Sequence, residues 1–477
     1  MTARTVDNLG SPSSAGHPQA LRRTLSFADM VIYSLIFMCV ISVFGIFGSV
    51  FQASGGMVVS AYVVGMVVMM VTASSYGLLV QAYPEAGSVY AYAGRVIAPS
   101  VGFLAGWVIL LDYINVPGLL SVIAAASMTA VWPAVSMSAW IVRFVVLNTI
   151  INLLGIRMTR LMNKVFLIGS LFILAVYLLA GVLALADGKG RGFSWDPVFA
   201  SGQFRLGVVL SGASVAGLSF LGFDALSTLA EDAKEGARQV SRAMVAGLGL
   251  IGLLFIAQAL VGALLVTDPA TLIADGDPAG TVVYETARVA AGPWLQTAAA
   301  IAVGLAWGLA NNMVAQVATS RLVYAMARDG QLPRRLAKIS VSRAVPTNAI
   351  LLIAAISLGL GLYMASRDDG ITLMASLVNF GALLSFLVVH VCVLGQKLRG
   401  RKLAGGWFRV WVLPPVGIVS LAAIIWNTNA LAQTVGVVWL GVGVLILIVL
   451  VASGRTPRLA GMEPGADTST ALAGHRG

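Results

Sequence analysis

The sequence has few charged residues. Only 10% of its 477 residues are Asp, Glu, Lys or Arg, against about 25% in an ordinary globular protein. This chain therefore lacks the polar material that covers the surface of soluble domains. Disordered chains are rich in charge and poor in apolar residues, so that class is excluded as well.

Cysteine and histidine are also scarce. The two cysteines, Cys39 and Cys392, lie far apart in apolar runs, and only three histidines occur. This pattern predicts neither a disulfide framework nor a metal site. The sequence contains no phosphate-binding loop and no soluble domain for nucleotide hydrolysis. We therefore expect neither an enzyme nor a cofactor.

Apolar residues are abundant, at 58% of the chain. They form apolar stretches near the length of about 20 residues that a bilayer requires, which predicts an all-α polytopic membrane protein embedded in the lipid bilayer. The twelve predicted stretches are 27–52, 57–82, 99–130, 138–155, 163–186, 206–230, 241–266, 285–325, 346–365, 371–396, 409–427 and 433–453. The eighth is too long for one span, and we expect its last part to run into the cytoplasm.

The net charge of +11 is explained by membrane topology and does not indicate nucleic-acid binding. Alternate loops and the two tails together hold 24 of the 30 Lys and Arg residues. Such a bias predicts a cell-membrane protein with both termini in the cytoplasm. The tails are rich in small and polar residues, and we expect disorder in residues 1–24 and 455–477.

Two carboxylates fall in the middle of apolar stretches. Asp112 lies in the third stretch and Asp224 in the sixth. Carboxylates at this depth mark a transport pathway or a proton site, although a structural hydrogen bond to a neighbouring helix is the alternative. His390, toward the end of the tenth stretch, is predicted to be an ordinary interfacial histidine.

The first and sixth stretches are interrupted by small residues. Residues 38–45 read MCVISVFG, and residues 217–224 read GLSFLGFD. Interrupted spans in corresponding positions indicate a transporter site, and a spacing of five helices makes the second copy inverted. Close helix packing at glycine is the alternative explanation.

Several motifs resemble the amino acid–polyamine–organocation superfamily. They are YPEAGSVY at 83–90, Gly222-Phe223-Asp224 followed by LAED at 229–232, and SRLVYAMARDGQLP at 320–333. Within the superfamily, the chain looks most similar to bacterial putrescine importers. The stretches that carry this likeness are LRRTL at 21–25, VIY at 31–33, LLDY at 110–113 and SLVNFGA at 376–382.

The resemblance implies a LeuT-like fold of five plus five inverted helices with two extra helices, working by alternating access. We expect the first repeat in residues 25–190, the second in 200–400 and the extra helices in 405–454. A monomer or homodimer is expected. The implied function is uptake of a small organic cation, with putrescine first, an amino acid second, and a channel or a non-transporting nutrient receptor as alternatives from other classes.

Two departures from the superfamily concern the site. Amino-acid transporters of the superfamily carry Gly-Ser-Gly in the first broken helix, where this chain has Val43-Phe44-Gly45. Bulky side chains there would obstruct a carboxylate cradle, which favours an amine without a carboxylate. Putrescine importers have prolines where Cys39 and Val43 stand, and some proton-coupled relatives have a lysine where Ser170 stands.

A diamine needs carboxylates, carbonyl groups or aromatic faces when it leaves water. We predict that the substrate is bound by side chains and freed backbone groups of the interrupted helices and their neighbours. The predicted binding residues are Val40, Ile41, Ser42, Asp112, Tyr113, Ser219, Phe220, Gly222, Phe223, Asn312 and Asn379. Asp224 is predicted to be a gate or proton carrier, and coupling to H⁺ is favoured over a sodium site at Thr319 and Ser320.

Overall fold

The computed structural model describes residues 25–83, 89–154, 159–200, 202, 204–328, 332–340 and 345–453. Within these ranges the chain is all-helical, and its one β-bridge joins Leu25 to Ala233. The first half holds α1 (Phe27–Phe37), α2 (Ser42–Ala53), α3 (Val58–Ala82), α4 (Val89–Val96), α5 (Pro99–Val131), α6 (Met137–Leu154), α7 (Thr159–Ala186), α8 (Leu206–Phe220) and η1 (Phe223–Asp232).

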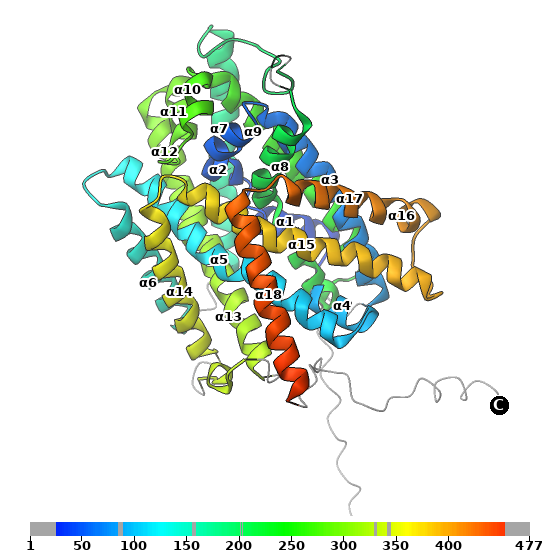
Figure 1. Cartoon of the computed structure of the whole chain (residues 1–477). Helices are drawn as coiled ribbons and strands as arrows, with labels where there is room; N and C mark the ends of the chain where they lie inside the picture. The colour runs from blue at the N-terminus through cyan, green and yellow to red at the C-terminus, as the bar shows by residue number, and fades with distance from the viewer. Residues whose placement is uncertain are drawn as a thin grey trace, which may run out of the picture.

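The second half follows the same all-helical pattern (Figure 1). It holds α9 (Ala237–Leu265), α10 (Pro269–Asp275), α11 (Val282–Ala291), α12 (Pro293–Leu305), η2 (Ala306–Asn311), α13 (Asn312–Arg328), η3 (Arg334–Ala337), α14 (Thr347–Ala365), α15 (Gly370–Leu398), α16 (Trp407–Trp411), α17 (Leu413–Trp426) and α18 (Ala430–Ala452). In Figure 1, α10 and α11 lie at the upper end of the bundle, and α13 and α18 finish at its lower end.

The predicted fold class is confirmed. In the described part of the chain, ten helical segments are long and apolar enough to cross a membrane, and the pair α1 and α2, bent by 51°, forms an eleventh. The shorter apolar helix α8, continued by η1, occupies the sixth predicted stretch. All twelve predicted stretches are therefore helical.

One predicted stretch is divided differently from the expectation. Residues 285–325 do not form a single run, because Gly292 has φ +92° and separates α11 from α12. Helical segments then continue from Pro293 to Arg328 over 36 residues. The excess length at the start of the stretch thus belongs to a separate helix at the α10 end.

Both predicted interruptions are present in the structure, and they contact each other. The first lies at residues 38–41, where Cys39 has φ +54°. The second lies at Leu221 and Gly222, where Gly222 has φ +106°. A Cβ atom on Gly222 would lie 2.9 Å from the carbonyl oxygen of Phe37. The end of α1 and the start of η1 therefore meet through a residue that only glycine fits.

Close packing at small residues holds two groups of helices. In the first group α3 packs along α8 and α9, α1 along α9 and α2 along α8; in the second α5 packs along α6, α12, α13 and α14. In the first group, Gly65 of α3 packs against Phe220 of α8. In the second group, Gly308 of η2 packs against Phe144 of α6. α15 lies along α5 and also contacts α3, and small residues at such crossings let helix backbones approach closely.

The prediction for His390 is wrong. This side chain is fully buried in α15, and its ring nitrogens hydrogen-bond with the hydroxyl groups of Ser75 (2.9 Å) and Thr72 (3.2 Å) of α3. A Cβ atom on Gly417 of α17 would lie 2.3 Å from the ring. His390 therefore joins α15 to α3 inside the protein.

Candidate substrate site

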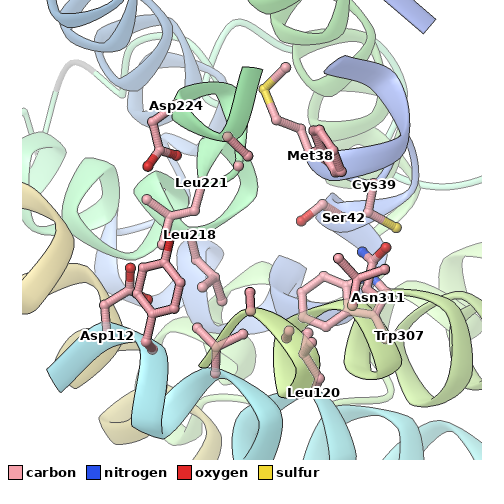
Figure 2. A pocket seen from close by; sticks show the side chains of 18 of the residues that line it. Met38, Cys39, Ser42, Asp112, Leu120, Leu218, Leu221, Asp224, Trp307 and Asn311 are labelled. Atoms are coloured by element: carbon pink, nitrogen blue, oxygen red, sulfur yellow. The ribbon is translucent and has the colours of Figure 1, made fainter. Parts of the chain in front are cut away.

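A cavity of about 190 Å³ lies where the two interruptions meet, between α1, α5, η1 and α13 (Figure 2). Ligand pockets commonly measure about 300–1,000 Å³, so this one fits a small substrate. Five of the predicted site residues line it: Ser42, Asp112, Tyr113, Gly222 and Asp224.

Asp112 lies on α5 with only 8% of its surface exposed. The backbone of α15 runs directly against it, since a Cβ atom on Gly381 would lie 2.8 Å from the Asp112 amide nitrogen. No Lys, Arg or His from the described residues lines the cavity. A buried carboxylate in such surroundings needs a cation or a proton.

Asp224 lies on the same side of the cavity as Asp112 in Figure 2. Unlike Asp112, which lies within α5, it lies in the first turn of η1, with the backbone amide groups of Gly222 and Ala225 close by. These groups form the start of η1, where the positive end of the helix dipole stabilises an anion. Both carboxyl groups thus line the cavity, but only that of Asp224 lies at the start of a helix.

The other side of the cavity is polar but uncharged. Figure 2 places Cys39, Ser42, Asn311 and Trp307 there. The Cys39 thiol lies within hydrogen-bonding reach of Trp307 and Asn311. Within the described part of the chain, the buried indole N–H of Trp307 has no nitrogen or oxygen acceptor.

Three predicted residues near the interruptions do not line this cavity. The carbonyl group of Val40 accepts a hydrogen bond from Gln258 of α9 at 2.9 Å, so this freed backbone group is already paired. Ile41 is fully buried. The hydroxyl group of Ser219 pairs with that of Tyr62 at 3.2 Å.

Four further predicted residues pack between helices instead of lining the cavity. Phe220 packs against Tyr62 and Phe255, and Phe223 against Tyr76 and Phe386. Asn312 donates to Ser121 of α5 at 2.7 Å. Asn379 donates to the carbonyl group of Ser214 in α8 at 2.6 Å.

Several lining residues were not predicted. They include Met38, Cys39, Leu120, Leu218, Leu221, Trp307, Asn311 and Phe386. Asn311 differs from the predicted Asn312 by one position, because the π-helical turn η2 widens the helix there and changes which side chain faces inward. The apolar residues carried no sequence signal that separates a cavity wall from ordinary packing.

Val43, Phe44 and Gly45, the residues matched to the Gly-Ser-Gly of amino-acid transporters, are buried within α2, just after the interruption at residues 38–41. Ser170 of α7 lines a smaller cavity of about 20 Å³, together with Cys39 and Asn311. This places Ser170, which stands where some proton-coupled relatives are expected to have a lysine, beside the first interruption.

Parts of the resemblance motifs lie outside the described residues. Positions 84–88 of the first motif and 329–331 of the third are not among the described residues. The described portion of the third motif is Ser320 to Arg328, which forms the end of α13, together with Leu332 and Pro333. Thr319, just before it, lines the cavity and donates a hydrogen bond to the Tyr113 carbonyl group at 2.7 Å.

Comparison with known proteins agrees with this architecture. A family model described as amino acid permease matches residues 30–453. The chain is 30% identical to the low-affinity putrescine importer PlaP of Escherichia coli, over 92% of this chain and 95% of that protein. It is 25% identical to a methylthioribose transporter and 23% identical to the branched-chain amino acid permease BcaP, both of Bacillus subtilis, over 91% and 90% of this chain and 94% and 93% of those proteins.

The fold and the central cavity define a multi-pass membrane permease of the amino acid–polyamine–organocation superfamily. The chain belongs to the amino acid permease family within it.

Proposed function

We propose that this protein is a secondary active transporter of the cell membrane that imports a small organic cation by alternating access. Putrescine is the first compound to test, because a putrescine importer is 30% identical over nearly the whole chain. The observation that carries the proposal is a small, buried cavity lined by two carboxyl groups and by no Lys, Arg or His from the described residues.

The electrostatics of the cavity favour a cation. An ionised carboxylate buried without a partner is costly, and a substrate ammonium group would supply the missing charge. Asp112 lies in the middle of α5, away from any helix start, whereas Asp224 lies in the first turn of η1, so we assign the ammonium to Asp112. Tyr113 and Phe386 supply aromatic surfaces in the same cavity.

An amino acid is the second candidate, since amino acid permeases are among the relatives. Backbone amide groups at the start of α2, just after the first interruption, argue against it. The amide groups of Ser42 and Phe44 donate to the carbonyl groups of Cys39 (2.7 Å) and Ile41 (3.0 Å). These donors are therefore occupied and do not form a cradle for a carboxylate.

Coupling to protons is proposed over coupling to sodium. Asp224 lies at the junction of the cavity and η1, where a change of protonation would alter its hydrogen bonds with the start of that helix. The hydroxyl groups of Thr319 and Ser320, the residues suggested for sodium, donate to backbone carbonyl groups of Tyr113 and Val317. Both termini are proposed to be cytoplasmic from the charge bias of the loops.

The test is Asp112→Asn, which keeps the shape of the side chain and removes its charge. Loss of a charge-assisted hydrogen bond of about 1.5–3 kcal/mol should weaken diamine affinity roughly ten- to a hundredfold. The measurement is putrescine uptake into vesicles that contain the purified protein, at equal reconstitution. An affinity that stays within about twofold would show that Asp112 is only a structural hydrogen-bond partner.

A further inference from the structure

We propose that the preferred substrate carries an ammonium group at one end and an uncharged hydrogen-bond acceptor, such as a hydroxyl, ether or amide oxygen, at the other. This inference rests on the proposed function, because it assigns the ammonium to Asp112. It comes from the difference between the two sides of the central cavity (Figure 2).

The first side is anionic. Asp112 and Asp224 lie together there, and both carboxyl groups of the cavity are on this side. A symmetric diamine therefore meets a carboxyl group at both ends only if both ammonium groups stay on this side. No Asp or Glu among the described residues lines the opposite side.

Trp307 lines the opposite side and is 2% exposed. Its indole nitrogen is enclosed by the protein and has no hydrogen-bond partner among the described residues. The neighbouring Cys39 thiol is a weak acceptor at best. An ammonium group can only donate, so it would leave the indole N–H unsatisfied, which is unfavourable in a buried site.

The acceptor that fits is uncharged. A carboxylate would also accept from Trp307, but no cationic side chain from the described part of the chain lines the cavity. The amide groups of Ser42 and Phe44 are already bonded within the chain. The side chains of Ser42 and Asn311, which line the same side, can both donate and accept, and so they suit a hydroxyl or amide group.

Three four-carbon amines that differ only at the far end provide the test: 4-amino-1-butanol, 1,4-diaminobutane and 4-aminobutanoate. The dissociation constant of each is measured on the purified full-length protein from the rise in unfolding temperature with ligand concentration. We expect the amino alcohol to bind at least about fivefold more tightly than either of the other two, as one additional satisfied hydrogen bond implies.

The variant Trp307→Phe tests whether the indole N–H group causes the preference for the amino alcohol. The change should weaken binding of the amino alcohol about three- to tenfold and leave the diamine within about twofold. Trp439→Phe is the matched control, because its indole N–H donates to the Trp107 carbonyl group at 2.7 Å, away from the cavity. That control should leave all three affinities unchanged. The unfolding temperature without ligand shows whether each variant is folded.

The inference is overturned if the diamine or the amino acid binds as tightly as the amino alcohol, or if Trp307→Phe weakens all three ligands equally. Asp112→Asn separates the two proposals, since it should weaken all three. If it does so while the amino alcohol is not preferred, the inference fails and the proposed function stands. If no amine binds, or Asp112→Asn changes nothing, both proposals fail.

Discussion

Cys39 is the one non-glycine residue in the described ranges with a positive φ angle, +54°. A residue with a Cβ atom in this conformation is strained by about 1–2 kcal/mol. The strain lies at the first interruption, beside the cavity, where the chain turns from α1 into α2. Strained residues of this kind persist where the surrounding structure holds them, which is common at functional sites.

Cys39→Gly and Cys39→Ala both remove the thiol, but only glycine relieves the strain. We expect the glycine variant to be more stable than the alanine variant by about 0.5–1.5 kcal/mol, after the higher entropy of glycine in the unfolded chain is deducted. The measurement is the free energy of unfolding in detergent micelles.

The other cysteine provides the control for this comparison. Cys392 lies within α15, where glycine is about 1 kcal/mol worse than alanine. The order of the two variants should therefore reverse at Cys392. An alanine variant at Cys39 that is as stable as the glycine variant would contradict the strained conformation.

At single positions, the sequence predicted residues whose chemistry is unusual for a membrane helix. Asp112, Asp224 and Ser42 stand out in apolar stretches, and all three line the cavity. Cys39 and Trp307 do not stand out, because their role depends on a strained backbone angle and on an unpaired N–H group. The packing of Phe220 and Asn379 between helices was equally hidden, since an aromatic ring or an amide is compatible with either role.

The lengths and positions of the helices could be predicted from the apolar stretches, but the irregular turns within them could not. The π-helical turn Ala306–Asn311 has no signature in hydrophobic periodicity. The break at Gly292 did have a signal, the dipeptide Gly292-Pro293, which commonly marks a turn. The length of the apolar stretch concealed it.

Gly222 joins the two interrupted spans, and replacement by alanine tests this contact. The added Cβ would be strained at φ +106° and would lie 2.9 Å from the Phe37 carbonyl oxygen. We expect Gly222→Ala to lower the free energy of unfolding by more than about 2 kcal/mol. Uptake should be lost, because the added Cβ would displace the end of α1 or the start of η1, both of which line the cavity.

Gly400→Ala separates conformational strain from the contact. Gly400 also has a positive φ, +73°, but nothing lies within 4 Å of an added Cβ. This variant should lose only about 1 kcal/mol and keep its uptake. Equal effects at the two positions would mean that the contact with Phe37 is unimportant.

For the whole molecule, the central cavity lies between the two groups of helices that small residues hold together. α1 of the first group, together with η1, which packs against α9, faces α5 and α13 of the second group across it. The protein is closed at the α10 end, where α2 packs against Asp277: a Cβ on Gly48 of α2 would lie 2.3 Å from that side chain. The Asp277 carboxyl group accepts hydrogen bonds from the backbone amide groups of Thr281 (2.9 Å) and Val282 (3.2 Å). Burial raises the pKa of this carboxyl group.

Alternating access requires this closed end to open, which a reversible cross-link would prevent. Ser49 of α2 and Thr372 of α15 lie at this end, with their hydroxyl oxygens 2.8 Å apart. Cysteines at these two positions would bring their sulfur atoms close to bonding distance. In a protein with Cys39 and Cys392 replaced by alanine, oxidation of this pair should abolish uptake, and reduction should restore it.

α15 packs most extensively along α5 of the second group, so the pair at positions 49 and 372 joins the two groups. A second cysteine pair inside one group shows whether the effect comes from motion between groups. Ser121 of α5 and Asn312 of α13 are joined by a hydrogen bond of 2.7 Å, and both belong to the second group. Because these helices move together if the two groups move as units, oxidation of the Ser121→Cys, Asn312→Cys pair should leave its uptake unchanged relative to the reduced protein. Cross-link yield is measured by gel mobility and uptake in the same vesicles. Full uptake with a quantitatively formed bond between positions 49 and 372 would mean that transport does not require α2 and α15 to separate.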